Sequence, residues 1–163
     1  MNNNDIVIRL RYALDIKDND MLTIFHLGGI EMSKETLRTL LTKQVDEELP
    51  KDAVCSTQTL EAFLNGLITF KRGEAPVKNG VAAQPTFLMS SQKNVNNVLI
   101  KKVKIALSMT SDEVLDALRL AGVYASDSEL SAILRKEGHR NYKECGDRYA
   151  RNFLKGLAIQ NRK

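Results

Sequence analysis

Apolar residues recur every three or four positions along most of the chain, which is the spacing of one face of a helix. The first such stretch has Ile6, Leu10, Ala13 and Leu14 on one side. The pattern predicts four short helices in each half of the chain. They cover about residues 5–14, 19–27, 34–43 and 56–70, followed by residues 98–107, 111–121, 127–136 and 146–160.

Capping residues mark several ends of these helices. Thr110 and Glu113 have the spacing of a capping box at a helix start. Gly29 and Gly122 follow the second helix of each half, where a glycine C-cap ends a helix. We therefore expect an all-α fold.

The two halves resemble each other when the chain is shifted by 93 positions. Residues 4–43 then give ten identical pairs, where ordinary composition gives roughly two or three by chance. The pairs are Asn4/Asn97, Ala13/Ala106, Leu14/Leu107, Leu22/Leu115, Leu27/Leu120, Gly29/Gly122, Ser33/Ser126, Leu37/Leu130, Leu41/Leu134 and Lys43/Lys136. After a three-residue deletion the shift becomes 90, and Cys55, Phe63, Leu64, Gly66 and Leu67 meet Cys145, Phe153, Leu154, Gly156 and Leu157.

The repeat predicts two tandem copies of a four-helix unit, residues 1–72 and 93–163, joined by a linker at residues 73–92. The linker holds two of the three prolines and little periodicity. Each unit alone has a thin core, so we expect the copies to pack with approximate two-fold pseudosymmetry.

Residues shared by both copies are expected to serve the fold. Gly66 and Gly156 lie inside helices, where glycine costs about 1 kcal/mol relative to alanine, so we expect a close helix crossing at each. Cys55 recurs as Cys145, and we interpret both as small buried residues. Only Cys145 has a nearby histidine, His139, which leaves a cysteine-dependent enzyme as a minor alternative.

Charge divides unequally between the halves. Residues 1–92 carry ten Lys and Arg against twelve Asp and Glu, whereas residues 93–163 carry fourteen against eight. A basic half favours an acidic partner, although a basic surface also serves solubility alone. No apolar run of membrane-spanning or signal-peptide length is present, so we expect a cytoplasmic protein without a membrane partner.

Basic and aromatic residues gather in residues 138–155, whose polar part has no counterpart in the first copy. Such a mixture can contact phosphates and stack on bases, although a solvated helix face has the same composition. The candidate binding residues are His139, Arg140, Asn141, Tyr142, Lys143, Arg148, Arg151 and Lys155. No cluster of ligand residues predicts a metal or a cofactor, and no catalytic constellation is found.

Three motifs carry a resemblance to a known family. They are NDI-x-x-x-LRYAL near the start, FLNGLI-x-x-KRG at residues 63–73, and NYKECGDR followed by FLKGL. The chain resembles the YehS-like bacterial proteins over nearly its whole length outside the linker. That family is a tandem domain of unknown function, and the resemblance implies no activity, cofactor or site residue.

The sequence thus predicts a non-enzymatic binding module that contacts an acidic partner, nucleic acid first, through the basic second repeat. The alternative is a protein–protein adaptor or homodimer with an apolar groove between the two copies.

Overall fold

The computed structural model describes residues 1–42, 55–73 and 85–162, and all regular structure within them is helical. The all-α prediction is confirmed. The α-helices are α1 (Asn3–Ala13), α2 (Asp18–Leu27), α3 (Lys34–Leu41), α4 (Thr57–Arg72), α5 (Val95–Ala106), α6 (Ser111–Leu120), α7 (Asp127–Leu134) and α8 (Asp147–Asn161). A short 3₁₀ helix, η2 (Gln92–Asn94), precedes α5.

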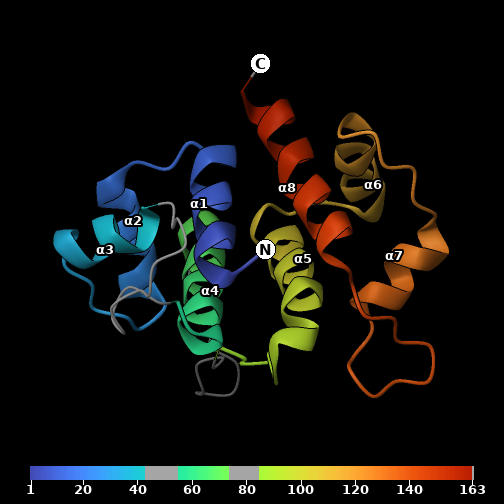
Figure 1. Cartoon of the computed structure of the whole chain (residues 1–163), viewed down its shortest axis with the longest axis horizontal. Helices are drawn as coiled ribbons and strands as arrows, with labels where there is room; N and C mark the ends of the chain where they lie inside the picture. Colours follow the sequence, from blue (N-terminus) through green and yellow to red (C-terminus); the bar gives the residue numbers. More distant parts are fainter. Residues whose placement is uncertain (43–54, 74–84, 163) are drawn as a thin grey trace.

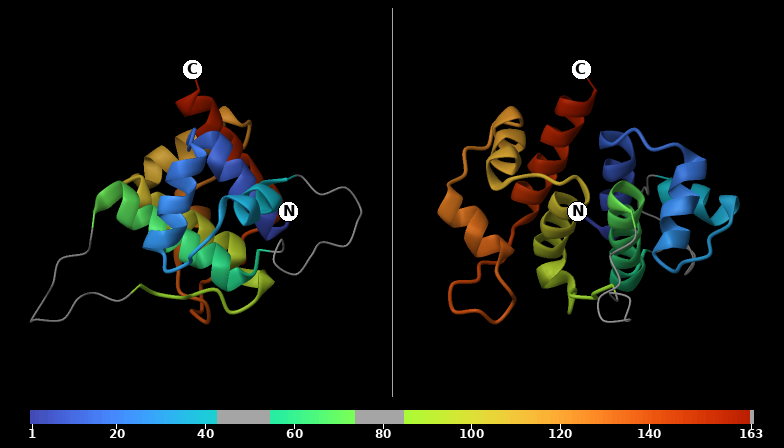
Figure 2. Two further views of the ribbon diagram at one scale, coloured as in Figure 1. Left: turned by 90° about the vertical axis from the view of Figure 1, so that its left-hand side faces the viewer. Right: turned by 180° about the vertical axis from the view of Figure 1, so that it is seen from behind.

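Four helices, α1, α4, α5 and α8, form the centre of the molecule (Figure 1). Helices α2 and α3 flank them on one side, and α6 and α7 flank them on the other, as the view from behind also shows (Figure 2). Helix α4 packs against α2 and α5, while α8 packs against α6 and α1. The segments that meet in the centre therefore come from opposite halves of the chain.

The third helix of each half ends earlier than predicted. Helix α3 ends at Leu41 and α7 ends at Leu134, two residues short of the expected ends. The residues that follow, Thr42 and Arg135, have extended backbone. Periodicity alone could not place these ends. In the last turn of each helix, a carbonyl accepts a hydrogen bond from a distant side chain and not from a further helical residue.

Those tertiary bonds come from two buried asparagines. Asn4 donates its amide to the carbonyl of Leu40 at 3.1 Å, and its side-chain oxygen accepts the N–H of Cys55 at 2.9 Å. Asn97 donates in the same way to the carbonyl of Ile133 at 3.0 Å and accepts the N–H of Cys145 at 2.9 Å. The side chain of each asparagine thus joins three segments that are distant in sequence.

Glycines allow two close helix crossings. A Cβ on Gly66 would overlap the carbonyl of Ile24 in α2, and a Cβ on Gly156 would overlap the carbonyl of Ala117 in α6. Helix α4 therefore meets α2 backbone to backbone, and α8 meets α6 in the same way. Gly29 and Gly122 have positive φ values of 94° and 86° after α2 and α6, which glycine adopts without strain.

The predicted linker, residues 73–92, is only partly within the described residues, because residues 74–84 lie outside them. Residues Thr86–Met89, which we call the latch segment, form no helix or strand and lie on the α4/α5 pair. In Figure 1 this stretch lies below α4 and α5, and the left view of Figure 2 shows it running beneath α4. The division into two repeats, residues 1–72 and 93–163, joined by a linker at residues 73–92, stays a prediction.

A buried ion pair holds the latch segment. Glu61 of α4 and Lys102 of α5 are 1% and 3% exposed and form a 2.9 Å salt bridge. The Glu61 carboxylate also accepts the N–H groups of Leu88 and Met89, at 2.6 and 2.8 Å. Lys102 and Asn65 both donate to the carbonyl of Thr86.

Candidate functional site

The structure separates the eight predicted binding residues into two regions. His139 to Lys143 lie in the loop between α7 and α8, whereas Arg148, Arg151 and Lys155 lie on α8. Tyr142 is half-buried and the other seven side chains are exposed.

Two of the loop residues, His139 and Lys143, form bonds with other residues of the protein. The ring of His139 accepts the backbone N–H of Asn141 at 3.0 Å. Lys143 forms a 3.3 Å salt bridge with Glu129, and its carbonyl accepts the amide of Asn97. The charge of Lys143 is therefore already paired in the folded protein.

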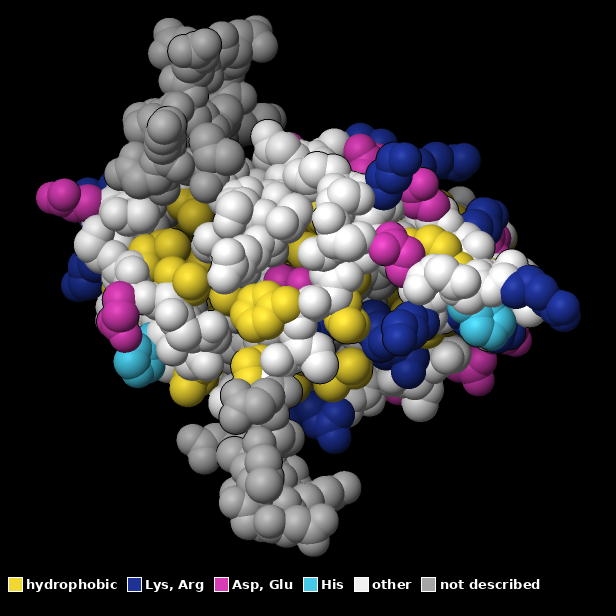
Figure 3. Space-filling view, turned by 90° about the horizontal axis from the view of Figure 1, so that it is seen from below, with side chains coloured by type: hydrophobic (Ala, Val, Ile, Leu, Met, Phe, Trp, Pro, Cys, Tyr) yellow, Lys and Arg dark blue, Asp and Glu magenta, His cyan; other side chains and the backbone are white. Residues whose placement is uncertain are grey.

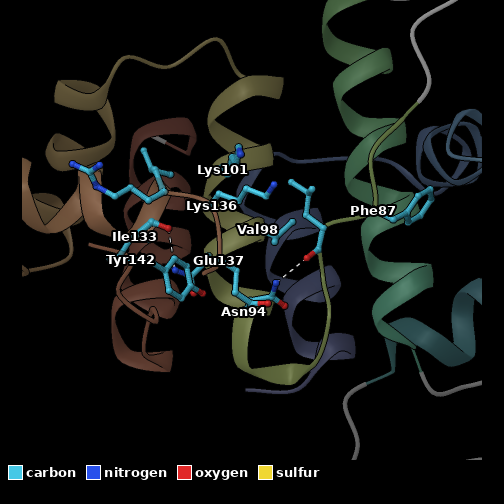
Figure 4. A pocket seen from close by; sticks show the side chains of 12 residues that line it. Phe87, Asn94, Val98, Lys101, Ile133, Lys136, Glu137 and Tyr142 are labelled. Carbon is cyan, nitrogen blue, oxygen red and sulfur yellow. Dashed lines mark hydrogen bonds between the residues drawn. The ribbon is translucent and has the colours of Figure 1, made fainter. Parts of the chain in front are cut away.

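Tyr142 lines a hollow of about 370 Å³ between α5 and the end of α7. Figure 4 shows Lys101 and Lys136 at one side of this hollow and Phe87 at the other. Seen from below, hydrophobic side chains gather in the middle of the molecule beside a group of Lys and Arg side chains (Figure 3). Burial raises the pKa of the Tyr142 hydroxyl, with the charges of nearby carboxylates adding to the effect, so this hydroxyl stays protonated.

Arg151 and Lys155 line a different hollow, which we call the α1/α8 groove. It measures about 550 Å³ and lies between the two helices. Its lining residues are Ile8, Arg9, Tyr12, Arg151, Asn152, Leu154, Lys155 and Ala158. One wall comes from the first half of the chain and the other from the second half, so neither half contains the groove alone.

Three cations surround an apolar floor in this groove. Arg9, Arg151 and Lys155 are exposed, and none of them forms a salt bridge with another described residue. No acidic side chain lines the groove. Ile8 and Ala158, which are partly buried, supply apolar surface between the charges, and the buried Leu154 lies beneath them. The groove can therefore bind an anionic group and an apolar group of the same ligand.

Contacts at both ends hold α1 and α8 side by side and parallel. At the start, the Met1 ammonium donates to Asp147 at 2.8 Å. At the end, Arg162 donates to the carbonyl of Tyr12 at 3.0 Å and lies 4.0 Å from the centre of its ring. Hydrogen bonds from the Met1 ammonium and Asn96 lower the pKa of Asp147, which keeps this carboxylate charged. Both walls of the groove are thus fixed relative to each other.

Sequence reasoning found Arg151 and Lys155 but missed Arg9 and Tyr12. On α8, Arg148, Arg151 and Lys155 share one exposed helical face. On α1, Arg9 and Tyr12 also share an exposed face, but the acidic net charge of the first half gives no sign of a cationic surface there. The pairing of these two faces depends on tertiary packing.

The cysteines lack the properties of a catalytic nucleophile. Cys55 and Cys145 are buried, and burial raises the pKa of each thiol to about 12. A thiol with this pKa is almost entirely protonated at neutral pH and a poor nucleophile.

Within residues 1–42, 55–73 and 85–162, no group of three His, Cys, Asp or Glu side chains could hold a metal ion. In the same ranges, every helix is too short or too polar to cross a membrane.

Two comparisons place the chain among known proteins. The family model described as a protein of unknown function, DUF1456, matches residues 3–73 and 96–163. The uncharacterized protein YehS of Escherichia coli (strain K12) is 35% identical over 160 residues, which cover 98% of this chain and 96% of that protein. The resemblance expected from the sequence motifs is confirmed. No solved structure matches the chain.

Proposed function

The chain belongs to the DUF1456 family, a family of unknown function, and we propose that it is a non-enzymatic binding module for an acidic partner. The α1/α8 groove is the proposed contact surface. The observation that carries the proposal is the set of three cations, Arg9, Arg151 and Lys155, around an apolar floor with no acidic side chain among the lining residues. Arg140 and Arg148, which are exposed, extend the proposed surface along the second half.

The proposal includes an architecture. Two copies of a four-helix unit, residues 1–72 and 93–163, are joined by residues 73–92 and related by an approximate two-fold axis. Its support is that the asparagine bonds and the glycine crossings recur at shifts of 93 and 90 residues. In this architecture the α1/α8 groove lies between the two copies, because one wall comes from each copy. We also propose a cytoplasmic location, which suits two free thiols.

Two classes of acidic partner suit this groove, nucleic acids and acidic polypeptides. The Tyr12 side chain is 57% exposed beside the three cations, with Arg162 over one face of its ring. In nucleic-acid-binding proteins, such rings stack on bases and the neighbouring cations contact phosphates. Such binding weakens steeply with salt, because phosphate contacts release counterions.

Reversing the three charges together tests the function. The variant Arg9→Glu, Arg151→Glu, Lys155→Glu is expected to bind polyanions about tenfold more weakly or worse, since each exposed ion pair contributes roughly 0.5–1 kcal/mol. The measurement is fluorescence anisotropy of two labelled probes, a ten-residue polyglutamate and a ten-nucleotide single strand, at low salt.

A second variant controls for net charge. Lys34, Arg38 and Lys93 are exposed and lie outside the groove, so their reversal to glutamate changes the total charge equally. This control should keep polyanion binding within about twofold. Equal weakening in both variants would show that net charge, and not the groove, governs binding.

A further inference from the structure

We propose that the α1/α8 groove binds a non-helical acidic segment of another polypeptide, in the way that the α4/α5 pair holds the latch segment. This inference rests on the proposed function and names the partner class. The α4/α5 pair carries a ligand of its own chain, whereas the α1/α8 groove is open.

The two helix pairs correspond residue by residue. Under the shift of 93, α1 matches α5 and Arg9 matches Lys102. Under the shift of 90, α8 matches α4, so that Arg151 matches Glu61 and Lys155 matches Asn65. Three residues that line the open groove thus occupy the positions of the three residues that hold the latch segment.

A contact at the end of each pair supports this correspondence. Arg162 donates to the carbonyl of Tyr12, and its counterpart Arg72 donates to the carbonyl of Ile105, which is the counterpart of Tyr12. Arginines at equivalent positions therefore join the two helices at the same end of both pairs. The two pairs have the same direction and register.

The α4/α5 pair is chemically suited to a polypeptide backbone. Glu61 accepts two consecutive N–H groups, from Leu88 and Met89. Asn65 and Lys102 donate to the carbonyl of Thr86, and Lys102 also donates to its hydroxyl at 3.2 Å. The Glu61 carboxylate thus binds backbone N–H groups of the latch segment, while Asn65 and Lys102 bind its backbone carbonyl.

The open groove has donors at all three positions. Arg9 and Lys155 can donate hydrogen bonds to a backbone carbonyl, as Lys102 and Asn65 donate to that of Thr86. Arg151 stands where Glu61 accepts N–H groups, and a guanidinium can only donate there. A ligand must therefore bring an additional acceptor to Arg151, and a carboxylate is the side chain that pairs with arginine in two hydrogen bonds.

The floor of the groove favours a polypeptide over a nucleic acid strand. Ile8 and Ala158 present apolar surface between the cations, and an aliphatic side chain fits such a surface better than a sugar–phosphate chain. The partner segment is therefore expected to combine acidic residues with at least one large apolar residue.

Three six-residue peptides test the inference on the full-length protein. The first is PTFLMS, the sequence of residues 85–90; the second, DDFLMD, adds acidic residues around the same apolar centre; the third, KKFLMK, adds basic ones. Anisotropy of labelled peptides is expected to show DDFLMD binding at least tenfold more tightly than PTFLMS, with KKFLMK weakest. A six-nucleotide single strand is measured beside them.

A variant that copies the latch positions provides the sharper test. Arg9→Lys, Arg151→Glu and Lys155→Asn give the open groove the residues of the α4/α5 pair. We expect this variant to lose at least tenfold in affinity for DDFLMD and to bind PTFLMS more tightly than the wild type does. The control Lys34→Asn, Arg38→Glu changes net charge by the same amount outside the groove, and thermal unfolding confirms that each variant is folded.

The outcomes separate the inference from the proposed function. Strong binding of the single strand, lost in the variant, with no binding of DDFLMD, would overturn the peptide inference and leave an anion-binding groove. Equal loss of DDFLMD in the variant and the control would also overturn it, because charge alone would then explain binding. Binding of no acidic probe at all would overturn both.

Discussion

Replacing Gly156 with alanine is expected to lower the free energy of unfolding by about 3 kcal/mol. The new methyl group would overlap the backbone carbonyl of Ala117, and backbone atoms at a helix crossing cannot move aside as a flexible side chain does. Alanine has the better helix propensity by about 1 kcal/mol, but this gain is smaller than the cost of separating α6 from α8. Urea unfolding followed by circular dichroism measures the change.

Gly66 and Gly146 provide the comparison. Gly66→Ala meets the carbonyl of Ile24 and should cost as much as Gly156→Ala, whereas Gly146 has open space around its Cβ position. Gly146 is the N-cap of α8, so its change to alanine should cost about 1 kcal/mol or less. A Gly156→Ala protein as stable as the wild type would mean that the crossing is looser than described.

Replacing Lys102 with methionine is expected to cost about 3–5 kcal/mol, because it leaves the Glu61 carboxylate buried without its counter-charge. Burial lowers the pKa of Lys102, and the hydrogen bond and charge of Glu61 oppose that shift. The latch segment should loosen at the same time, since Lys102 holds Thr86. Amide exchange at Leu88 and Met89 reports that local effect alongside the unfolding measurement.

A double variant tests this explanation of the Lys102 effect. Adding Glu61→Gln to Lys102→Met removes the buried charge while keeping one acceptor for the latch segment, so the double variant should be more stable than Lys102→Met alone. Lys104→Met, on the same helix but outside the ion pair, should change stability by no more than about 0.5 kcal/mol. A double variant less stable than the single one would contradict the explanation.

Sequence patterns predicted the helices well because each follows from local spacing and caps. The Thr110 hydroxyl accepts the N–H of Glu113, and the Glu113 carboxylate accepts the N–H of Thr110, as the capping pattern indicates. Sequence patterns could not place the ends of α3 and α7, which depend on Asn4 and Asn97 from distant helices.

The candidate site was predicted only in part, for a different physical reason. Arg151 and Lys155 stood out because they lie in a basic segment, whereas Arg9 lies in an acidic half and becomes part of the groove only when α1 packs on α8. Glu61 and Lys102 were missed altogether, because charged residues on helices are usually exposed and their burial depends on each other. The alignment of the two halves contained a signal for them, since Glu61 and Arg151 fall on the same position at a shift of 90 and have opposite charges.

The location of the bound anion is the most direct test of the proposed groove. The backbone amide resonances of the labelled protein, recorded during titration with a ten-residue polyglutamate, give that location residue by residue. The groove predicts that the largest changes fall on residues 8–12 of α1 and residues 151–158 of α8, on both walls together. Changes confined to the loop at residues 138–146, with α1 unaffected, would contradict the groove as the binding surface.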